Sequence, residues 1–186
     1  AVLAAAQKAL KDGDFQWEES TGLSTQNEDP GAIAISDDGD IYTVGGFRES
    51  LDLDPGVGTF PVYQDGFGND LFVQKLNAMG EFVWGYAITG NGSDAVRGLE
   101  VDNDGNVVIA GSFSFDVSFN PAAPDEITSS AGNFDGFIQK IDSDRNQNWL
   151  QRFGGAEHDQ CIGVAVDPTN NIFVVGYFAE TVDFDF

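Results

Sequence analysis

The chain has 186 residues, an apolar fraction of 41% and a formal net charge of −23, from 31 acidic and 8 basic side chains. The apolar fraction is enough for a hydrophobic core, and no run of about 20 apolar residues is present to cross a membrane as a helix. The excess of acids argues against nucleic acid and anionic membranes as partners, because both are bound through basic patches. A well-solvated surface explains the acidity most simply; calcium binding and a saline environment are the more specific alternatives.

The first predicted element lies within residues 1–14, where two signals disagree. The alanine-rich start of the chain has high helical propensity. Gln7-Lys8, however, recurs as Gln74-Lys75 and Gln139-Lys140, and each pair precedes a tryptophan by nine residues, counted from the lysine. Because the later pairs lie in strand-like runs, we predict a strand here as well.

An internal repeat organises the rest of the chain. The three tryptophans, Trp17, Trp84 and Trp149, are 67 and 65 residues apart. Glycines recur at intervals of 66 and 65 residues, at Gly45, Gly111 and Gly176. A fixed period of this length indicates copied structural units. The units span about 4–69, 70–134 and 135–186, and the third is truncated within a repeated phrase.

The middle unit shows the elements expected in each copy. Apolar runs rich in β-branched and aromatic residues predict four strands and a short fifth, at 71–76, 81–88, 98–101, 107–113 and 117–119. The phrase at 102–106, Asp-Asn-Asp-Gly-Asn, predicts a tight turn in which Asp and Asn bond their own backbone and Gly takes a positive φ. Asn170 replaces this glycine in the third copy. The recurring glycines within strands predict bulges or close backbone approaches.

These elements predict an all-β fold, a β-propeller built of four-stranded antiparallel blades with about 65 residues per repeat. A β-solenoid or a row of small sandwiches is the alternative, although solenoids usually have a shorter period. We expect the tryptophans to mark the second strand of each blade. Residues 1–186 form one propeller domain or part of one, because three repeats are fewer than the roughly four to eight blades of a closed ring. Either the chain belongs to a longer protein or copies assemble into a ring, and the end at Phe186, inside a repeated phrase, favours the longer protein.

Two stretches carry a family resemblance. Residues 98–111 and 70–77 resemble the SBBP-type bacterial β-propeller repeat, and 51–56 resembles the "DFDPG" segment of secreted and surface proteins. The resemblance extends over the chain from about residue 7. It implies a propeller fold at the cell surface with adhesion or scaffolding roles. Ser118 and Asn120 depart from the pattern, because they replace its acids in the middle copy.

Catalytic motifs are sparse, and we assign no catalytic or cofactor-binding residue. His158 is the sole histidine, which excludes a histidine-rich metal site, and we expect it to be an exposed loop residue. Cys161 is the sole cysteine, so no intrachain disulfide can form, and we expect it to be a small buried residue. A glycosidase carboxylate pair is compatible with the composition, but no pair stands out from the repeat.

Calcium is the best-supported cofactor from the sequence. The acids alternate with apolar residues at Asp52, Asp54, Asp183 and Asp185. In a strand this alternation places both acids of a pair on one face, and carboxylates are the ligands that Ca²⁺ prefers. A polar strand edge is the competing interpretation.

The sequence therefore predicts a non-catalytic binding or architectural module of a secreted or cell-surface bacterial protein. Its expected partners are a protein or a glycan at the cell surface, or other parts of a longer chain; nucleic acid is not expected, nor is a membrane span. One alternative is a propeller glycosidase or lyase whose catalytic acids lie elsewhere in a longer chain. Another is a self-assembling subunit of a ring or surface lattice.

Overall fold

The structure is a computed structural model that describes residues 2–11, 14–24, 29–182 and 184, with 2–11, 14–24 and 30 described by their backbone alone. The regular elements in these ranges are all strands, and their strand pairs are antiparallel, as predicted. In chain order they are β1 (Val2–Lys11), β2 (Asp14–Ser24), β3 (Asp29–Ile35), β4 (Ile41–Phe47), β5 (Ser50–Asp52), β6 (Pro61–Tyr63), β7 (Asp70–Leu76), β8 (Phe82–Gly90), β9 (Ala95–Val101), β10 (Val107–Phe113), β11 (Asp116–Ser118), β12 (Ile127–Ser129), β13 (Asp135–Ile141), β14 (Gln147–Phe153), β15 (Gln160–Val166) and β16 (Ile172–Tyr177).

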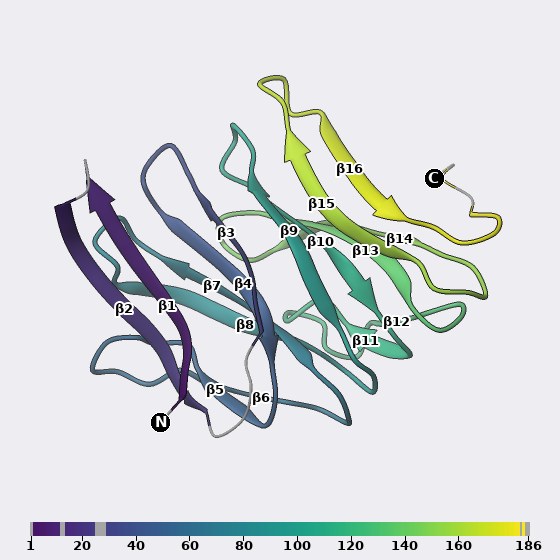
Figure 1. Ribbon diagram of the computed structural model, residues 1–186, viewed down its shortest axis with the longest axis horizontal. Coiled ribbons are helices and arrows are strands. Elements are labelled where there is room, and N and C mark those ends of the chain that lie inside the picture. The colour runs from purple at the N-terminus through teal and green to yellow at the C-terminus, as the bar shows by residue number, and fades with distance from the viewer. Residues whose placement is uncertain (1, 12–13, 25–28, 183, 185–186) are drawn as a thin grey trace.

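Two complete four-stranded units lie in the middle of the molecule. The first blade has the order β3-β4-β7-β8, and the second has the order β9-β10-β13-β14. The hairpins β1–β2 and β15–β16 each form a two-stranded sheet. Figure 1 shows the sheets side by side in chain order, with β1–β2 at one end and β15–β16 at the other. The described residues thus form an open series of blades and no closed ring.

The blades are out of phase with the repeat units that the sequence suggests. Each unit begins at the third strand of a blade, because β4 pairs along its whole length with β7 across the boundary at 69/70. Trp84 lies on β8 and Trp149 on β14, each the fourth strand of its blade. The expectation that tryptophans mark the second strand is therefore wrong. The segment Val2–Lys11 is a strand, as its register predicted.

Short hairpins inserted between the second and third strands tie neighbouring blades together. The hairpin β11–β12 interrupts the second blade in sequence, yet β11 pairs with β8 of the first blade. The hairpin β5–β6 holds the corresponding place one repeat earlier, and β5 contacts β2. The first and second blades are therefore linked by the pairing of β11 with β8 as well as by side-chain packing.

The main core lies between the two complete blades. The facing side chains of β7 and β8 meet those of β10 and β13 in one buried cluster. Phe113, Phe119 and Phe137 form an aromatic group, with ring centroids 5.3 Å apart for Phe113–Phe119 and 4.8 Å apart for Phe119–Phe137. Fully burying one such side chain stabilises a fold by about 1.5–3 kcal/mol. The blade–blade interface is therefore the main source of apolar stabilisation.

The recurring strand glycines face a bulge in the innermost strand of each blade, as predicted. The register of β3 slips opposite Gly45, that of β9 slips opposite Gly111, and that of β15 slips opposite Gly176. A Cβ on Gly45 would lie 2.7 Å from the Phe72 ring and 2.8 Å from the Asp29 carbonyl oxygen. No side chain fits there without displacing the bulge.

The predicted turn chemistry is also confirmed. Gly39, Gly105 and Asn170 have φ values of 85°, 78° and 63° at equivalent places in the three turns that join the first two strands of a blade. In the turns that join the last two strands, Gly80 and Arg145 have φ values of 84° and 74°. Asparagine tolerates this left-handed conformation, which explains its use in place of glycine.

We predict that Gly45→Ala destabilises the chain by about 1–3 kcal/mol, because the new methyl group overpacks the bulge. Gly46→Ala is the matched control, since its Cβ would have ordinary contacts at 3.7 Å or more and should change stability by no more than about 0.5 kcal/mol. Urea unfolding of both variants measures the difference. Equal effects would contradict the steric role of Gly45.

Candidate functional site

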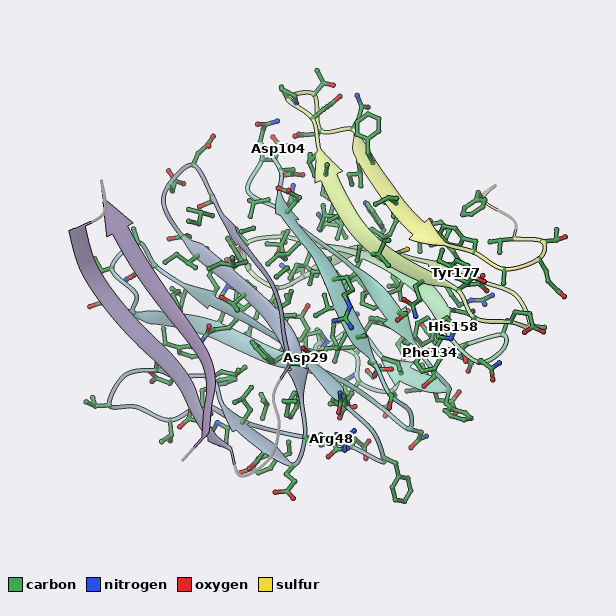
Figure 2. The ribbon with its side chains drawn as sticks, viewed as in Figure 1. Asp29, Arg48, Asp104, Phe134, His158 and Tyr177 are labelled. Carbon is green, nitrogen blue, oxygen red and sulfur yellow. The ribbon has the colours of Figure 1, made fainter. Side chains whose placement is uncertain are left out.

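One end of the blades carries a concentration of acidic turns. Antiparallel pairing places the turns 36–40, 77–81, 102–106, 142–146 and 167–171 at the same end of the strands. We call this surface the acidic turn face; its acids are Asp37, Asp38, Asp40, Glu81, Asp102, Asp104, Asp142, Asp144 and Asp167. Figure 2 labels Asp104 on this face and Arg48 toward the opposite end.

The first residue of each turn is used to hold the turn itself. The Asp102 carboxylate accepts hydrogen bonds from the backbone N–H of Asn106 at 2.8 Å and of Asp104 at 3.0 Å. Asp142 and Asp167 accept the equivalent pairs of bonds. The Asn171 amide and these backbone donors lower the pKa of Asp167 to about 2. These three carboxylates are therefore committed to structure and ionised at neutral pH.

Two lysines on the third strands of the blades, the buried Lys75 and the half-buried Lys140, form ion pairs with acids of the acidic turn face. Lys140 Nζ lies 2.6 Å from Asp102 Oδ2, and Lys75 Nζ lies 2.8 Å from Asp40 Oδ2. Ser36 stands in the first blade where Asp102 stands in the second, so Lys75 takes the acid at the far end of its turn instead. Burial raises the pKa of Asp102, but the Lys140 and Asn106 hydrogen bonds outweigh it and lower the pKa overall.

An acidic cleft separates the turns 36–40 and 102–106, which join the first two strands of the first and second blades and are called inner turns, as is 167–171. It has a volume of about 230 Å³, and its lining consists of Ile35, Ser36, Asp37, Asp38, Val101, Asp102, Asn103, Asp104 and Gly105. The next pair of inner turns is bridged, because Asn170 Nδ2 donates to Asp104 Oδ2 at 2.8 Å and Asn103 N donates to Asn170 Oδ1 at 3.0 Å. The cleft therefore lies between turns that no described side chain bridges, with Asp37 and Asp38 on one wall and Asp102 and Asp104 on the other. Its oxygen-rich lining can accept a cation, a basic side chain or hydroxyl groups.

A second acidic feature is buried between strands at the opposite end. Asp70 accepts hydrogen bonds from Gly90 N at 3.1 Å and Asp65 N at 2.7 Å, whereas Asp94 accepts one from Ser114 N at 3.3 Å. Asp94 Oδ2 is buried without a hydrogen-bond partner among the described residues. Burial raises the pKa of Asp94 to about 8 and that of Asp70 to about 6. The charge of Asp70 contributes to the upward shift at Asp94.

An equivalent pair, Asp135 and Asp159, lies one repeat later, and in it the equivalent glycine N–H donates to the other acid. In the second blade Gly155 N donates to Asp159 at 2.9 Å, whereas the equivalent Gly90 N donates to Asp70. Asp135 is consequently the member with an unpartnered oxygen, although Arg152 forms an ion pair with its other oxygen. These acids were not among the residues singled out from the sequence, although both recur at the repeat spacing of 65 residues, at 70/135 and 94/159.

The acids predicted as calcium ligands are only partly described. Asp52 Oδ1 accepts hydrogen bonds from Phe60 N at 2.7 Å and Asp54 N at 3.1 Å, and Asp54 Oδ1 accepts one from Gly56 N at 2.8 Å. Asn120 makes the same bond to Ala122 N one repeat later, so this turn does not require a charge. Asp183 and Asp185 lie outside the described residues. Within the described ranges, no three His, Cys, Asp or Glu side chains come together as a metal site.

His158 and Cys161, the sole histidine and the sole cysteine, both pack against neighbouring residues. His158 is half-buried, with its ring centroid 4.8 Å from that of Phe134 and a close contact to Gln160; the expectation of an exposed residue is wrong, because the isolated bridge between 134 and 158 pins the loop. Cys161 is fully buried, as predicted, and burial raises the pKa of its thiol to about 12.

The recurring glutamines have a role that the sequence analysis did not assign. Gln74 Nε2 donates to the Leu53 carbonyl at 2.7 Å, and Gln139 Nε2 donates to the Phe119 carbonyl at 2.9 Å. Both side chains are fully buried. They anchor the inserted segment to the third strand of the blade. From the sequence alone, these glutamines serve only to mark the repeat register.

Comparisons with known proteins agree with the repeat architecture. The family model "Beta-propeller repeat" (SBBP) matches residues 148–177, which confirms the resemblance there. The chain is 22% identical over 139 residues to Regulatory protein FlaEY of Caulobacter vibrioides, covering 75% of this chain and 14% of that protein. It is 26% identical over 111 residues to Uncharacterized WD repeat-containing protein L264 of Acanthamoeba polyphaga mimivirus, covering 58% of this chain and 8% of that protein. The chain therefore spans a small part of either relative. Among the described residues, no helix is long and apolar enough to cross a membrane.

The buried acids predict an unusual pH dependence of stability. Their folded pKa values lie above the ordinary value of 3.8, so the folded state binds more protons than the unfolded state between these values. Stability must then fall as pH rises through about 6 and about 8. Between pH 5 and pH 9 the wild-type chain should lose free energy of unfolding as Asp94 ionises. We predict that Asp94→Asn reduces this loss by roughly 1–3 kcal/mol, which corresponds to about 3–9 °C in Tm.

The control for this prediction is Asp125→Asn, which removes one exposed charge in the loop between β11 and β12. It should leave the slope of Tm against pH unchanged. A parallel slope in wild type and Asp94→Asn, measured by thermal unfolding at several pH values, would show that burial of Asp94 does not control the pH response.

Proposed function

We propose that this chain is a non-catalytic binding module of the β-propeller-repeat type, and that its partner docks on the acidic turn face. The observation that carries the proposal is the cleft between the first and second inner turns, which is open while the next pair of turns is bridged by Asn103 and Asn170. A recess formed by loops on a rigid sheet framework is where propeller-like proteins can vary their contacts without altering the core.

The charge of the cleft indicates the chemistry of the partner. Asp37 and Asp38 line the cleft, and neither is held by a lysine as Asp40 and Asp102 are. With a net charge of −23 on the chain, long-range attraction favours a basic partner. We therefore propose a protein segment that bears lysine or arginine, in preference to a glycan. The WD-repeat description of one relative and the regulatory description of the other support a binding role.

The location of the module is part of the same proposal. The resemblance of 51–56 to surface-protein segments supports an extracellular or cell-surface setting in a bacterium. Calcium at Asp52 and Asp54 remains a prediction: both are partly exposed at the end of β5 and have carboxylate oxygens available beyond the backbone bonds.

The binding proposal predicts a site-specific loss of affinity. The variant Asp37→Asn/Asp38→Asn/Asp104→Asn should weaken binding of a hexalysine peptide about tenfold or more at low salt, because the cleft loses three of the four carboxylates that line it. The variant Asp65→Asn/Asp125→Asn/Glu157→Gln removes the same charge outside the acidic turn face and should change affinity less than about twofold. Isothermal titration calorimetry of both variants makes the comparison.

Equal weakening by the two variants would mean that the peptide reads net charge, and the cleft would not be the site. Turnover of a polysaccharide in a substrate screen, abolished by a single carboxylate substitution, would contradict the non-catalytic proposal directly.

The calcium prediction is tested with the chain and the metal alone. Because a ligand that binds only the folded state raises Tm, 5–10 mM CaCl₂ should raise Tm by about 2–5 °C relative to EGTA, and Asp52→Asn/Asp54→Asn should abolish the increase. Magnesium at the same ionic strength is the control. An identical Tm in calcium and in EGTA would remove the site.

A further inference from the structure

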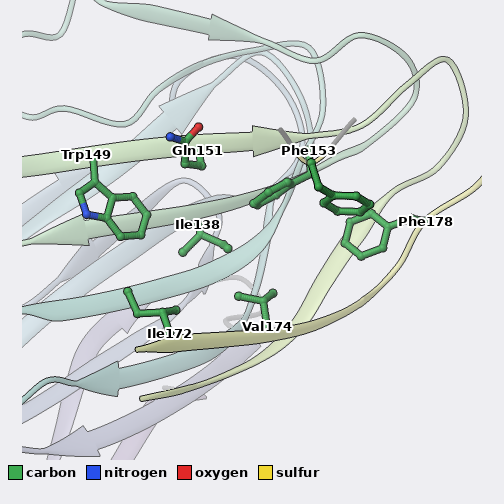
Figure 3. A pocket seen from close by; sticks show the side chains of 8 residues that line it. Ile138, Trp149, Gln151, Phe153, Ile172, Val174 and Phe178 are labelled. Carbon is green, nitrogen blue, oxygen red and sulfur yellow. The ribbon is translucent and has the colours of Figure 1, made fainter. Parts of the chain in front are cut away.

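An apolar groove lies between the second blade and the hairpin β15–β16, far from the acidic cleft in sequence. It has a volume of about 630 Å³, and its lining consists of Ile138, Trp149, Gln151, Phe153, Ile172, Val174, Phe178 and Phe184. Figure 3 shows Trp149, Ile138 and Phe153 on one wall, facing Ile172, Val174 and Phe178 on the other. We call it the C-terminal groove.

The repeat supplies a filled copy of this groove. Shifted by 65 residues, its lining becomes Val73, Trp84, Tyr86, Ile88, Val107, Ile109, Phe113 and Phe119, all of which are buried in the core between the two complete blades. There the space is filled by β13, whose Phe137 and Ile141 belong to the same cluster, with Leu150 of β14 packed against it. The C-terminal groove has both walls of that interface and lacks this filling.

A strand equivalent to β13 would also find a free strand edge to pair with, that of β16. β4 pairs with β3 and β7, and β10 pairs with β9 and β13. Within the described part of the chain, β16 pairs with β15 alone. Val174 is 37% exposed, whereas its equivalent Ile109 is 1% exposed. An unpaired strand edge beside an apolar recess is suited to the addition of a strand.

The groove is already arranged as the filled interface is. The Phe178 and Phe184 rings lie 4.9 Å apart at an interplanar angle of 89°, and the equivalent Phe113 and Phe119 rings lie 5.3 Å apart at the same angle of 89°. Its walls therefore need little rearrangement to receive an aromatic side chain.

Polar positions repeat as well. In the filled interface Trp84 Nε1 donates to the Ser143 carbonyl at 2.9 Å, and Gln139 Nε2 donates to the Phe119 carbonyl at 2.9 Å. Trp149 and Phe184 occupy the corresponding places in the C-terminal groove. An incoming turn carbonyl and glutamine would find these same partners.

We propose that the C-terminal groove binds a β-hairpin of this same repeat type, which adds its first strand to the free edge of β16 and places a phenylalanine, a glutamine and an aliphatic residue, at alternate positions, into the groove. The pattern is that of Phe137, Gln139 and Ile141 on β13. The phenylalanine contacts Phe178 and Phe184, and the glutamine bonds the Phe184 carbonyl. Side-chain fit gives the specificity, and main-chain pairing gives the direction.

The hairpin β1–β2 of a second copy is the other conceivable occupant, and the sequence disfavours it. Aligned by Gln7 with Gln139, β1 has Ala5 and Ala9 where β13 has Phe137 and Ile141. Alanines would leave most of the groove unfilled, and unfilled apolar volume is costly. A repeat hairpin with the larger side chains is the occupant that the groove fits.

The test uses the intact chain and a synthetic peptide of its own residues 135–153, which span β13 and β14. We expect saturable binding with a Kd in the micromolar range by fluorescence anisotropy, and new protection from exchange at β16 amides. The Phe137→Ala peptide should bind at least tenfold more weakly, and a scrambled peptide should not bind.

Variants of the chain locate the site. Val174→Asp should abolish binding, whereas Val175→Asp, one residue along β16 on the opposite face, should retain it; thermal unfolding verifies that both fold. Equal binding of the native and scrambled peptides, or equal loss in the two chain variants, would overturn the proposal. Concentration-dependent dimerisation of the chain alone, lost in Val174→Asp and unaffected by the peptide, would assign the groove to a second copy instead and also overturn it.

Discussion

The stacking of one blade on the next is the interaction on which the rest of this structure depends. A four-stranded sheet alone exposes two apolar faces, and here one face of the first blade is covered by the second through Trp84, Phe113 and Phe137. Stability in such a series is approximately a sum of blade terms and nearest-neighbour interfaces. The described residues contain one interface between two complete blades, and a two-stranded hairpin lies beside each of these blades on its other side, β1–β2 by the first and β15–β16 by the second.

Polar groups fix how these blades stack and turn. Gln74 and Gln139 hold the inserted segments, and the carboxylates of Asp102, Asp142 and Asp167 close their hairpin turns by accepting backbone hydrogen bonds within the same turn. Most acids at the turn face therefore have a structural role, whereas Asp37 and Asp38 line the cleft and have no side-chain hydrogen bond or ion pair among the described residues, which is the reason for the docking proposal. The buried Asp70–Asp94 pair acts in the opposite sense, because ionising it costs stability.

Much of the fold follows from local sequence, but the strand at which each blade begins within the repeat does not. The period, the strands at 71–76 and 107–113, and the left-handed residues Gly105 and Asn170 depend on short-range chemistry, and the structure agrees with them. The grouping of strands into blades depends on which strands pair with each other across a long connection, and this cannot be read from a local pattern. The connection from β4 to β7 contains the hairpin β5–β6, and β4 pairs with β7 across it. Trp84 therefore lies on the last strand of its blade and not on the second, where the repeat had placed it.

The candidate site shows the same division. The acidic turns were evident as turns, but whether two of them leave a cleft depends on the distance between blades and on Asn170, 67 residues from its partner Asn103. The burial of Asp94 and the half-buried position of His158 likewise result from tertiary neighbours, Ser114 and Phe134, that no local pattern specifies.

Native-state hydrogen exchange tests the central claim, that complete blades are stabilised by stacking and that β16 presents an open edge. Amides of β10, which pair on both sides, should exchange only through global unfolding, whereas amides of β16 that point away from β15 should exchange orders of magnitude faster. Equal protection of β10 and β16 in the isolated chain would contradict this account.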